Sequence, residues 1–345
     1  MITKRKLIGL AAGAAMAAGM SPGIAVAQDV TLKLHQFLPA QANVPKLVLA
    51  PWAKRVEEAS KGKIKIDLYP SMQLGGKPPE LADQVKDGVA DIVWTVLGYT
   101  PGRFPQAEVF ELPFMMSNAE DTSRAYWQYA QANMMDTDFK DYKILAVWVH
   151  GPGLIHSNKP VRVPADLNGM KLRAPTRIIT KMLSELGATP VGMPVPAIPE
   201  ALSKGVIDGA VIPWEVTGAL KVQELVHNHT EFPGHSLYTT AFVLAMNKEK
   251  FDSLSQELKD AIDSQSGEDF SALAGKLQAS GDAPQRAKAV EMGNNIIELT
   301  PDEIQQWIDA SSKVAPEWAK EMDAKGFDGQ ALLDQARALI KKNTK

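Results

Sequence analysis

Segments rich in β-branched residues alternate with segments of helical spacing along most of this chain, and this alternation limits its fold more than any other property. Period-two or continuous apolar runs predict strands at 30–37, 64–69, 91–96, 143–149, 169–173, 189–192, 207–212 and 238–246. Apolar residues at intervals of three and four predict helices at 44–60, 79–86, 178–186 and 198–204. The alternation indicates an α/β fold with mostly parallel sheets and helices on both faces.

The last third of the chain is predicted to be almost wholly helical. A continuous helical pattern runs from 254 to about 293, with kinks expected at Gly267, Gly275 and Gly281. A short strand at 296–299 and two further helices complete the chain.

A secretory signal peptide is predicted at residues 1–27. Three cations at 4–6 precede an apolar run at 7–20, and the small residues at 25–27 form a cleavage site. The run is shorter than the roughly 20 residues that a membrane span requires, and no later run approaches that length. The mature chain is therefore expected to begin near Gln28 and to be exported without inserting into a membrane.

The 318 residues that remain of the 345 are enough for two hydrophobic cores. No low-complexity linker divides them, so we expect two lobes joined by more than one crossing of the chain. The first lobe is predicted from 28–151 and 237–280, and the second lobe together with the C-terminal helices from 152–236 and 281–345.

Composition and missing motifs argue against several classes of protein. Without the leader, 34 lysines and arginines face 40 acidic residues, a net charge of −6 with no basic run to hold nucleic acid. The chain has no cysteine and lacks the GxSxG, GxxxxGK[ST] and HExxH signatures. His227 and His229 could share one strand face, but no third ligand has compatible spacing for a metal. We therefore predict a protein that is not an enzyme and that binds no metal or cofactor.

Two similar segments each end on a tryptophan. Residues 86–94 read KDGVADIVW and residues 203–214 read SKGVIDGAVIPW, so in both a helix ends at a glycine and a buried strand follows. Trp94 and Trp214 should then lie near the carboxyl ends of their strands, where open α/β sheets form ligand crevices. Either one alone could be a core tryptophan. Their matching positions favour one aromatic side chain on each wall of a single cleft.

Arg173 is expected at the last position of a strand, on its polar side. In residues 168–175, NGMKLRAP, apolar residues alternate with Lys171 and Arg173, and Pro175 ends the ladder. A surface arginine paired with a neighbouring carboxylate would contribute about 0–1 kcal/mol. In a water-poor cleft the same guanidinium would hold a carboxylate by forked hydrogen bonds, each contributing roughly 1.5–3 kcal/mol. Position alone leaves both interpretations open.

Five separated segments are informative through their order and spacing. They read PSMQLGG at 70–76, LADQVKDGVADI at 81–92, FELPFMM at 110–116, LNGMKLRAP at 167–175 and EALSKGVIDGAVIPW at 200–214. Together they make the chain, from residue 30 to about 325, similar to the DctP-type solute receptors of tripartite ATP-independent periplasmic (TRAP) transporters. The resemblance implies two α/β lobes that close around a small organic acid, with a long C-terminal helix packed across both lobes.

The resemblance also implies a site and partners. The arginine of the G-x-K-x-R segment, here Arg173, would form the salt bridge to the ligand carboxylate. The receptor would act in the periplasm and deliver its ligand to the integral-membrane subunits of the transporter.

Two departures from the family pattern bear on the ligand. Many relatives carry a second arginine where this chain has Leu154, and an asparagine where it has Ile212. Alkyl groups there would leave the hydroxyls of a polar ligand unpaired, at about 1–3 kcal/mol each. This favours a monocarboxylate with an apolar or aromatic body over a sugar acid or a dicarboxylate. The other residues expected to contact the ligand are Phe37, Gln73, Trp94, Val195, Trp214 and Tyr238.

Three other functions stay open on the sequence. A receptor for an ATP-driven importer would share the two lobes but not the series of five segments. A periplasmic hydrolase or isomerase would convert the acid that it binds. A sensor partner would present the ligand to a membrane kinase.

Overall fold

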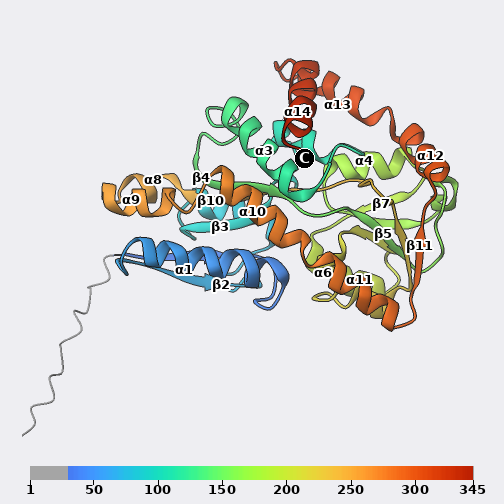
Figure 1. The fold of residues 1–345 in the computed structure, drawn as a ribbon, viewed down its shortest axis with the longest axis horizontal. Coiled ribbons are helices and arrows are strands. Elements are labelled where there is room, and N and C mark those ends of the chain that lie inside the picture. Colours follow the sequence, from blue (N-terminus) through green and yellow to red (C-terminus); the bar gives the residue numbers. More distant parts are fainter. Residues whose placement is uncertain (1–29, 345) are drawn as a thin grey trace, which may run out of the picture.

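Two β-sheets, each flanked by helices, lie at the two ends of the elongated molecule (Figure 1). The computed structural model of the chain describes residues 30–344. The predicted signal peptide lies outside these residues. Within them, no helix is both long and apolar enough to cross a membrane.

The first sheet has the strand order β2-β1-β3-β10-β4. Its strands are β1 (Val30–His35), β2 (Ile64–Tyr69), β3 (Ile92–Val96), β4 (Tyr142–Val149) and β10 (Ala241–Asn247). β1 is parallel to β2 and β3, whereas β10 is antiparallel to both of its neighbours, β3 and β4. The helical segments that accompany this sheet are η1 (Pro45–Leu49), α1 (Ala50–Ala59), η2 (Pro78–Glu80), α2 (Leu81–Lys86), η3 (Leu97–Tyr99), η4 (Pro105–Glu111) and α3 (Ala119–Asn133). We call this half of the molecule the first lobe.

The second sheet has the strand order β11-β9-β5-β8-β6-β7. Its strands are β5 (Leu154–Ser157), β6 (Lys171–Ala174), β7 (Thr189–Gly192), β8 (Gly209–Ile212), β9 (Asn228–Glu231) and β11 (Asn295–Glu298). β6 runs parallel to β7 and β8, while β5 is antiparallel to β8 and β9. Its helical segments are η5 (Pro164–Leu167), α4 (Arg177–Glu185), η6 (Val195–Ala197), α5 (Ile198–Ser203), α6 (Trp214–Thr217) and α7 (Val222–Leu225). This half is the second lobe.

The helical pattern predicted from 254 to about 293 is divided into three helices: α9 (Gln256–Asp263), α10 (Glu268–Ala279) and α11 (Asp282–Glu291). A short helix, α8 (Lys248–Asp252), precedes them directly after β10. Breaks fall at Gly267, which has a φ of +94°, and at Gly281. Gly275, however, lies inside α10 without a break. A Cβ atom there would lie 2.5 Å from the Ala119 carbonyl oxygen, so this glycine permits close packing of α10 on α3.

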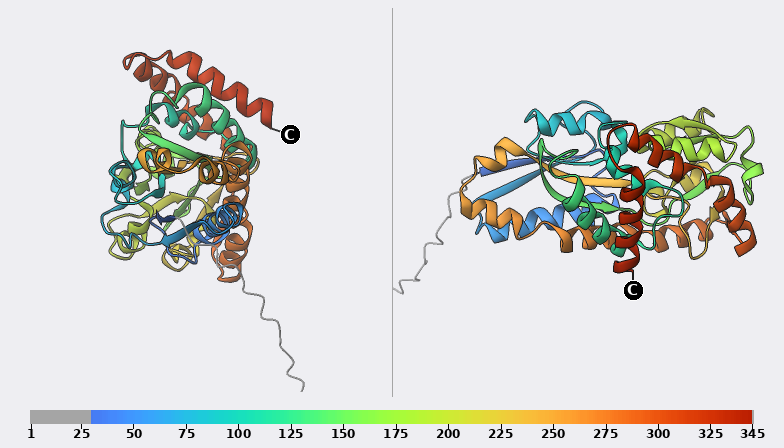
Figure 2. Two further views of the ribbon diagram at one scale, coloured as in Figure 1. Left: turned by 90° about the vertical axis from the view of Figure 1, so that its left-hand side faces the viewer. Right: turned by 90° about the horizontal axis from the view of Figure 1, so that it is seen from above.

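The lobes are connected several times. α10 packs on α3 and β4 of the first lobe, and α11 continues to α6 of the second, so this pair of helices spans both lobes (Figure 1). α12 (Pro301–Ser311) and α13 (Val314–Asp323) pack on α4, and α14 (Gly329–Asn343) returns to α3 (Figure 2). The sequence assigned residues 281–345 to the second lobe and the C-terminal helices, and of these helices α14 packs on the first lobe.

Candidate ligand-binding site

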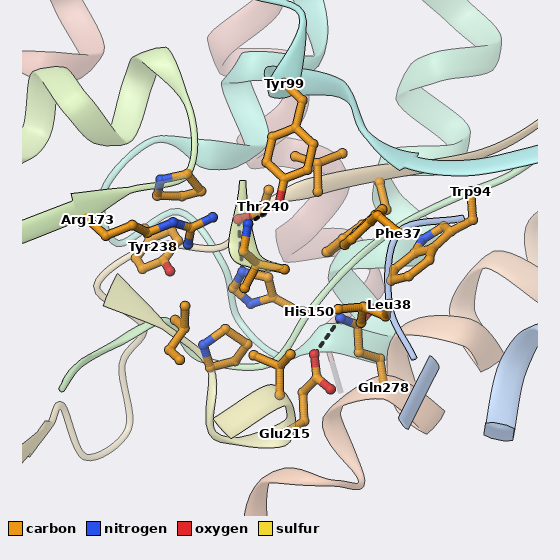
Figure 3. A pocket seen from close by; sticks show the side chains of 17 residues that line it. Phe37, Leu38, Trp94, Tyr99, His150, Arg173, Glu215, Tyr238, Thr240 and Gln278 are labelled. Atoms are coloured by element: carbon orange, nitrogen blue, oxygen red, sulfur yellow. Dashed lines mark hydrogen bonds between the residues drawn. The ribbon is translucent and has the colours of Figure 1, made fainter. Parts of the chain in front are cut away.

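A cavity with about 380 Å³ of empty volume lies between the two lobes (Figure 3). It occupies the place where the carboxyl ends of β1, β3 and β4 meet those of β6, β7 and β8. Residues that follow these strands line it: Phe37, Tyr99, His150, Pro175, Val195 and Pro213. The position is the one at which α/β sheets commonly bind ligands.

Arg173 extends from β6 into this cavity (Figure 3). Only 2% of the residue is exposed, although Lys171 on the same side of the strand is exposed, because the end of β6 is covered by the first lobe. Its Nε donates to the Met193 carbonyl oxygen at 2.9 Å, and Nη1 donates to the Val211 carbonyl oxygen at 3.1 Å. These bonds fix the plane of the guanidinium.

No carboxylate among the described residues pairs with this buried guanidinium. Burial lowers the pKa of Arg173 from its usual value, and the phenols of Tyr99 and Tyr238 act in the opposite direction. A buried charge is costly unless it is paired, and arginine stays protonated in proteins. Arg173 therefore supplies a positive charge that a bound anion would neutralise.

Besides the unpaired charge of Arg173, the cavity lining contains three buried polar atoms that have no hydrogen-bond partner within residues 30–344. They are Trp94 Nε1, Glu215 Oε2 and the Tyr238 hydroxyl. The Tyr99 hydroxyl accepts from the Val195 backbone N–H at 3.0 Å, which leaves its own proton to donate. Because nearly all buried polar groups in folded proteins are paired, these atoms are candidates for contacts with a ligand or water.

Aromatic rings form the wall of the cavity on the side of the first lobe. Phe37 stacks on Trp94 with 4.6 Å between ring centroids, and Trp94 stacks on Phe242 at 5.3 Å. Val195 and Ile212 provide alkyl groups from the second lobe. The cavity thus combines one cationic group with a mostly apolar interior.

His150 and Glu215 are the other titratable side chains of the lining besides the two phenols. The pKa of His150 is lowered to about 4 by burial, and its Nε2 lies 2.9 Å from the Thr240 hydroxyl. Burial raises the pKa of Glu215 to about 8. Near neutral pH both side chains are therefore mainly uncharged, and Arg173 sets the charge of the described lining at about +1.

Three residues expected at the ligand lie elsewhere. Trp214 and Leu154 line a neighbouring cavity, and Trp214 Nε1 donates to Glu231 Oε1 at 2.7 Å. Trp214 begins α6, so the alternation of β8 ends before it and its side chain does not follow that of Ile212. Leu154 pairs with Ile212 across the sheet, but its strand β5 is one strand farther from β6. Gln73 is exposed in the loop after β2.

The remaining six expected residues, Phe37, Trp94, Arg173, Val195, Ile212 and Tyr238, line the cavity between the lobes. Sequence reasoning missed several others. Tyr99 and His150 could have been found from their positions just after buried strands, which is also what indicated Trp94. Glu215 follows the end of β8 by three residues, as Tyr99 follows the end of β3, so it carried the same signal; Gln278 gave none, because it reaches the cavity from α10.

Buried contacts also join the lobes beside the cavity. Thr176 Oγ1 of the second lobe lies 2.6 Å from Glu111 Oε2 of the first, and Glu111 Oε1 accepts from the Ala241 backbone N–H at 3.0 Å. Arg177 contacts both carboxylate oxygens of Glu108. Burial raises the pKa of Glu111 to about 8, partly offset by its two hydrogen bonds.

We expect the free energy of unfolding to fall by at least about 1 kcal/mol between pH 6.5 and pH 9. Glu111 and Glu215 have folded-state pKa values near 8 and unfolded values near 4.3, so their stabilisation is complete below the unfolded pKa and is lost as pH rises through the folded one. Below about pH 6.5 the opposite trend from four histidines with lowered pKa values masks this effect. Those histidines are His35, His150, His156 and His229.

Urea denaturation across this range measures the effect. Glu111→Gln can keep both hydrogen bonds and should reduce the slope. A stability that is constant or rises above pH 6.5 would contradict the burial of these carboxyl groups in protonated form.

Two α/β lobes that enclose a small cavity with one buried guanidinium define a solute-binding receptor. The chain belongs to family 7 of the bacterial extracellular solute-binding proteins (DctP), whose model matches residues 36–321. This confirms both the resemblance seen in the five sequence segments and the two-lobed fold. It also places the chain in a family of solute-binding proteins rather than of enzymes.

Solved structures of TRAP solute-binding proteins resemble the whole described chain. One from Rhodoferax ferrireducens T118, in complex with copurified benzoate, is 51% identical, with a TM-score of 0.89 and coverage of 91% of this chain and 98% of that chain. Another, from a marine metagenome, is specific for aromatic acid ligands and was crystallised with 3-hydroxybenzoate; it is 49% identical, with a TM-score of 0.90 and coverage of 92% and 100%. A third, from Bordetella bronchiseptica, has bound (R)- and (S)-mandelate; it is 29% identical, with a TM-score of 0.85 and coverage of 91% and 100%.

Proposed function

We propose that this chain is the periplasmic receptor of a TRAP transporter and that it captures an aromatic monocarboxylate. The observation that carries the proposal is Arg173, a buried guanidinium without a carboxylate partner among the described residues, facing a cavity with aromatic walls. The benzoate, hydroxybenzoate and mandelate complexes of similar proteins support the same class of ligand.

The carboxylate would pair with the free edge of the Arg173 guanidinium. The hydroxyls of Tyr99 and Tyr238 line the same cavity and can donate to it. Receptor affinities from nanomolar to micromolar correspond to about −12 to −8 kcal/mol. Burial of the ring against Phe37 and Ile212, at roughly 25 cal/mol per Å² of apolar area, would add to the ion pair.

The charge of the cavity argues for one carboxylate rather than two. With His150 and Glu215 mainly neutral, a monoanion would neutralise Arg173, whereas a dicarboxylate would bury an unpaired negative charge. Ile212, at the position where the sequence pattern of many relatives has an amide, offers no partner for the several hydroxyls of a sugar acid.

Binding would be coupled to closure of the lobes. In the open form Arg173 would be accessible, and the contacts of Tyr99 with Val195 and of Glu111 with Thr176 would form as the second lobe moves over the ligand. A ligand shifts this equilibrium only by its preference for the closed form. The closed receptor would then dock on the membrane subunits and release the acid.

Isothermal titration calorimetry on the mature protein tests the proposed ligand class. Benzoate or 3-hydroxybenzoate should bind with a Kd between nanomolar and micromolar, and succinate and gluconate at least a hundredfold more weakly. Binding of succinate or gluconate with no binding of the aromatic acids would overturn the proposal. Mass spectrometry of the released acid checks the enzyme alternative, since a receptor returns it unchanged.

A further inference from the structure

Glu215 is a buried carboxyl group in the cavity that the pairing of Arg173 with a carboxylate does not use. It lies in the first turn of α6, is 5% exposed, and lines the cavity together with Arg173 (Figure 3). No lysine, arginine or histidine among the described residues forms an ion pair with it. Its oxygen Oε2 has no hydrogen-bond partner within residues 30–344.

The neighbours of Glu215 determine which of its oxygens is left without a hydrogen-bond partner. The Trp148 indole, which can only donate, lies 2.7 Å from Gln278 Oε1. The amide of Gln278 is thereby oriented with Nε2 toward Glu215, and Nε2 donates to Glu215 Oε1 at 2.8 Å. Because Oε1 is the acceptor, a proton on this carboxyl group resides on Oε2.

The surroundings favour the protonated form. The Glu215 backbone N–H donates to Asp282 Oδ1 at 2.8 Å, so a second acidic group lies beside it. Burial raises the pKa of Glu215 and the Asp282 carboxylate acts in the same direction, while the Gln278 hydrogen bond opposes them. Helix α10, which carries Gln278, is also tied to the first lobe by Asn43 Nδ2, which donates to the Gln278 carbonyl oxygen at 2.6 Å. The carboxyl group is thus held in place between the lobes.

We propose that Glu215 determines specificity by donating its Oε2 proton to a hydroxyl group on the ring of the ligand. The favoured ligand is then a hydroxylated aromatic monocarboxylate, whose carboxylate contacts Arg173 and whose hydroxyl oxygen contacts Glu215. This rests on the proposed function. A second carboxylate at the hydroxyl position has no cation to meet, and further hydroxyls would face the alkyl wall of Ile212.

The test compares Kd values of benzoate, 3-hydroxybenzoate and 4-hydroxybenzoate by calorimetry at pH 7 in three proteins. The readout is the Kd of benzoate divided by the Kd of whichever hydroxybenzoate binds more tightly. A substitution that weakens the binding of all three acids equally leaves this ratio unchanged. We expect a ratio of at least five in the unmodified protein. Glu215→Met should reduce the ratio to about one, since the methionine side chain neither donates nor accepts strongly.

Glu215→Gln is the matched variant. Its carbonyl oxygen can accept from Gln278 and its amide N–H can donate at the place of Oε2, so the ratio should stay within twofold of the original. A ratio near one in Glu215→Gln would overturn the donation of a proton by Glu215. The Glu215→Gln measurement tests the proposal even if Glu215→Met does not fold.

The other outcomes separate the inference from the proposed function. A ratio near one in the unmodified protein, or a ratio unchanged in Glu215→Met, overturns the role of Glu215 while the aromatic acids still bind. If none of the three acids binds the unmodified protein, the proposed function itself fails.

Discussion

Benzoate is expected to bind at least a hundredfold more weakly when Arg173 is replaced by methionine, and at least tenfold more weakly when it is replaced by lysine. Methionine removes the one cation of the described cavity lining, so the carboxylate would be buried without a partner; loss of one member of such a pair costs about 2–5 kcal/mol. Lysine keeps the charge but lacks the planar fork that contacts Met193, Val211 and a ligand at once.

Calorimetry of both variants with benzoate measures this effect, and circular dichroism checks that they fold. Arg337 is a suitable control, because its side chain is 55% exposed on α14, far from the cavity lining. Arg337→Met should bind benzoate as the unmodified protein does. An affinity that is unchanged in Arg173→Lys would remove the role of Arg173 as the anchor of the carboxylate.

Closure of the lobes should be impaired by adding one methyl group at Gly98. Gly98 lies in η3 of the first lobe, and a Cβ atom there would overlap the side chain of Thr176 in the second lobe. Thr176 cannot easily turn away, because its hydroxyl is hydrogen-bonded to Glu111. The backbone of Gly98 does not need a glycine, since its φ is not in the left-handed region. Gly98→Ala should therefore destabilise the closed form, in which the two lobes meet at this contact, and not the open form.

We expect Gly98→Ala to weaken benzoate binding at least tenfold, about 1.4 kcal/mol, because the competent closed form is less populated. The melting temperature without ligand should stay within about 2 °C, and small-angle scattering should show less compaction on adding benzoate. Gly192→Ala is the control, because a Cβ atom there meets nothing within 4 Å. Normal affinity and full compaction in Gly98→Ala would show that this contact does not accompany closure.

Much of the fold could be predicted from local patterns. β2 and β7 have their predicted bounds, and most other strands differ at their ends by one to three residues. The short strands β5 and β9 and the helix α3 were not predicted from residue patterns. β5 reads LIHS and β9 reads NHTE, so polar residues interrupt or replace an apolar pattern in both, and polar residues at several positions of α3 obscure its apolar stripe.

The site was predictable where it follows strand ends and not where it depends on tertiary packing. Arg173 and Trp94 lie at or near such ends, so the sequence indicated both. Trp214 was misplaced because α6 begins at this residue, so its side chain does not continue the alternation of β8 and lines the neighbouring cavity. Glu215 and Gln278 meet only because α10 crosses between the lobes, and no local pattern contains that information.

A diffraction structure of the protein with benzoate tests the central claim most directly. The carboxylate should lie within hydrogen-bond distance of the Arg173 guanidinium, with the ring against the wall formed by Phe37 and Trp94 and the two lobes in contact around it. A benzoate whose carboxylate points away from Arg173, or one bound outside this cavity, would contradict it.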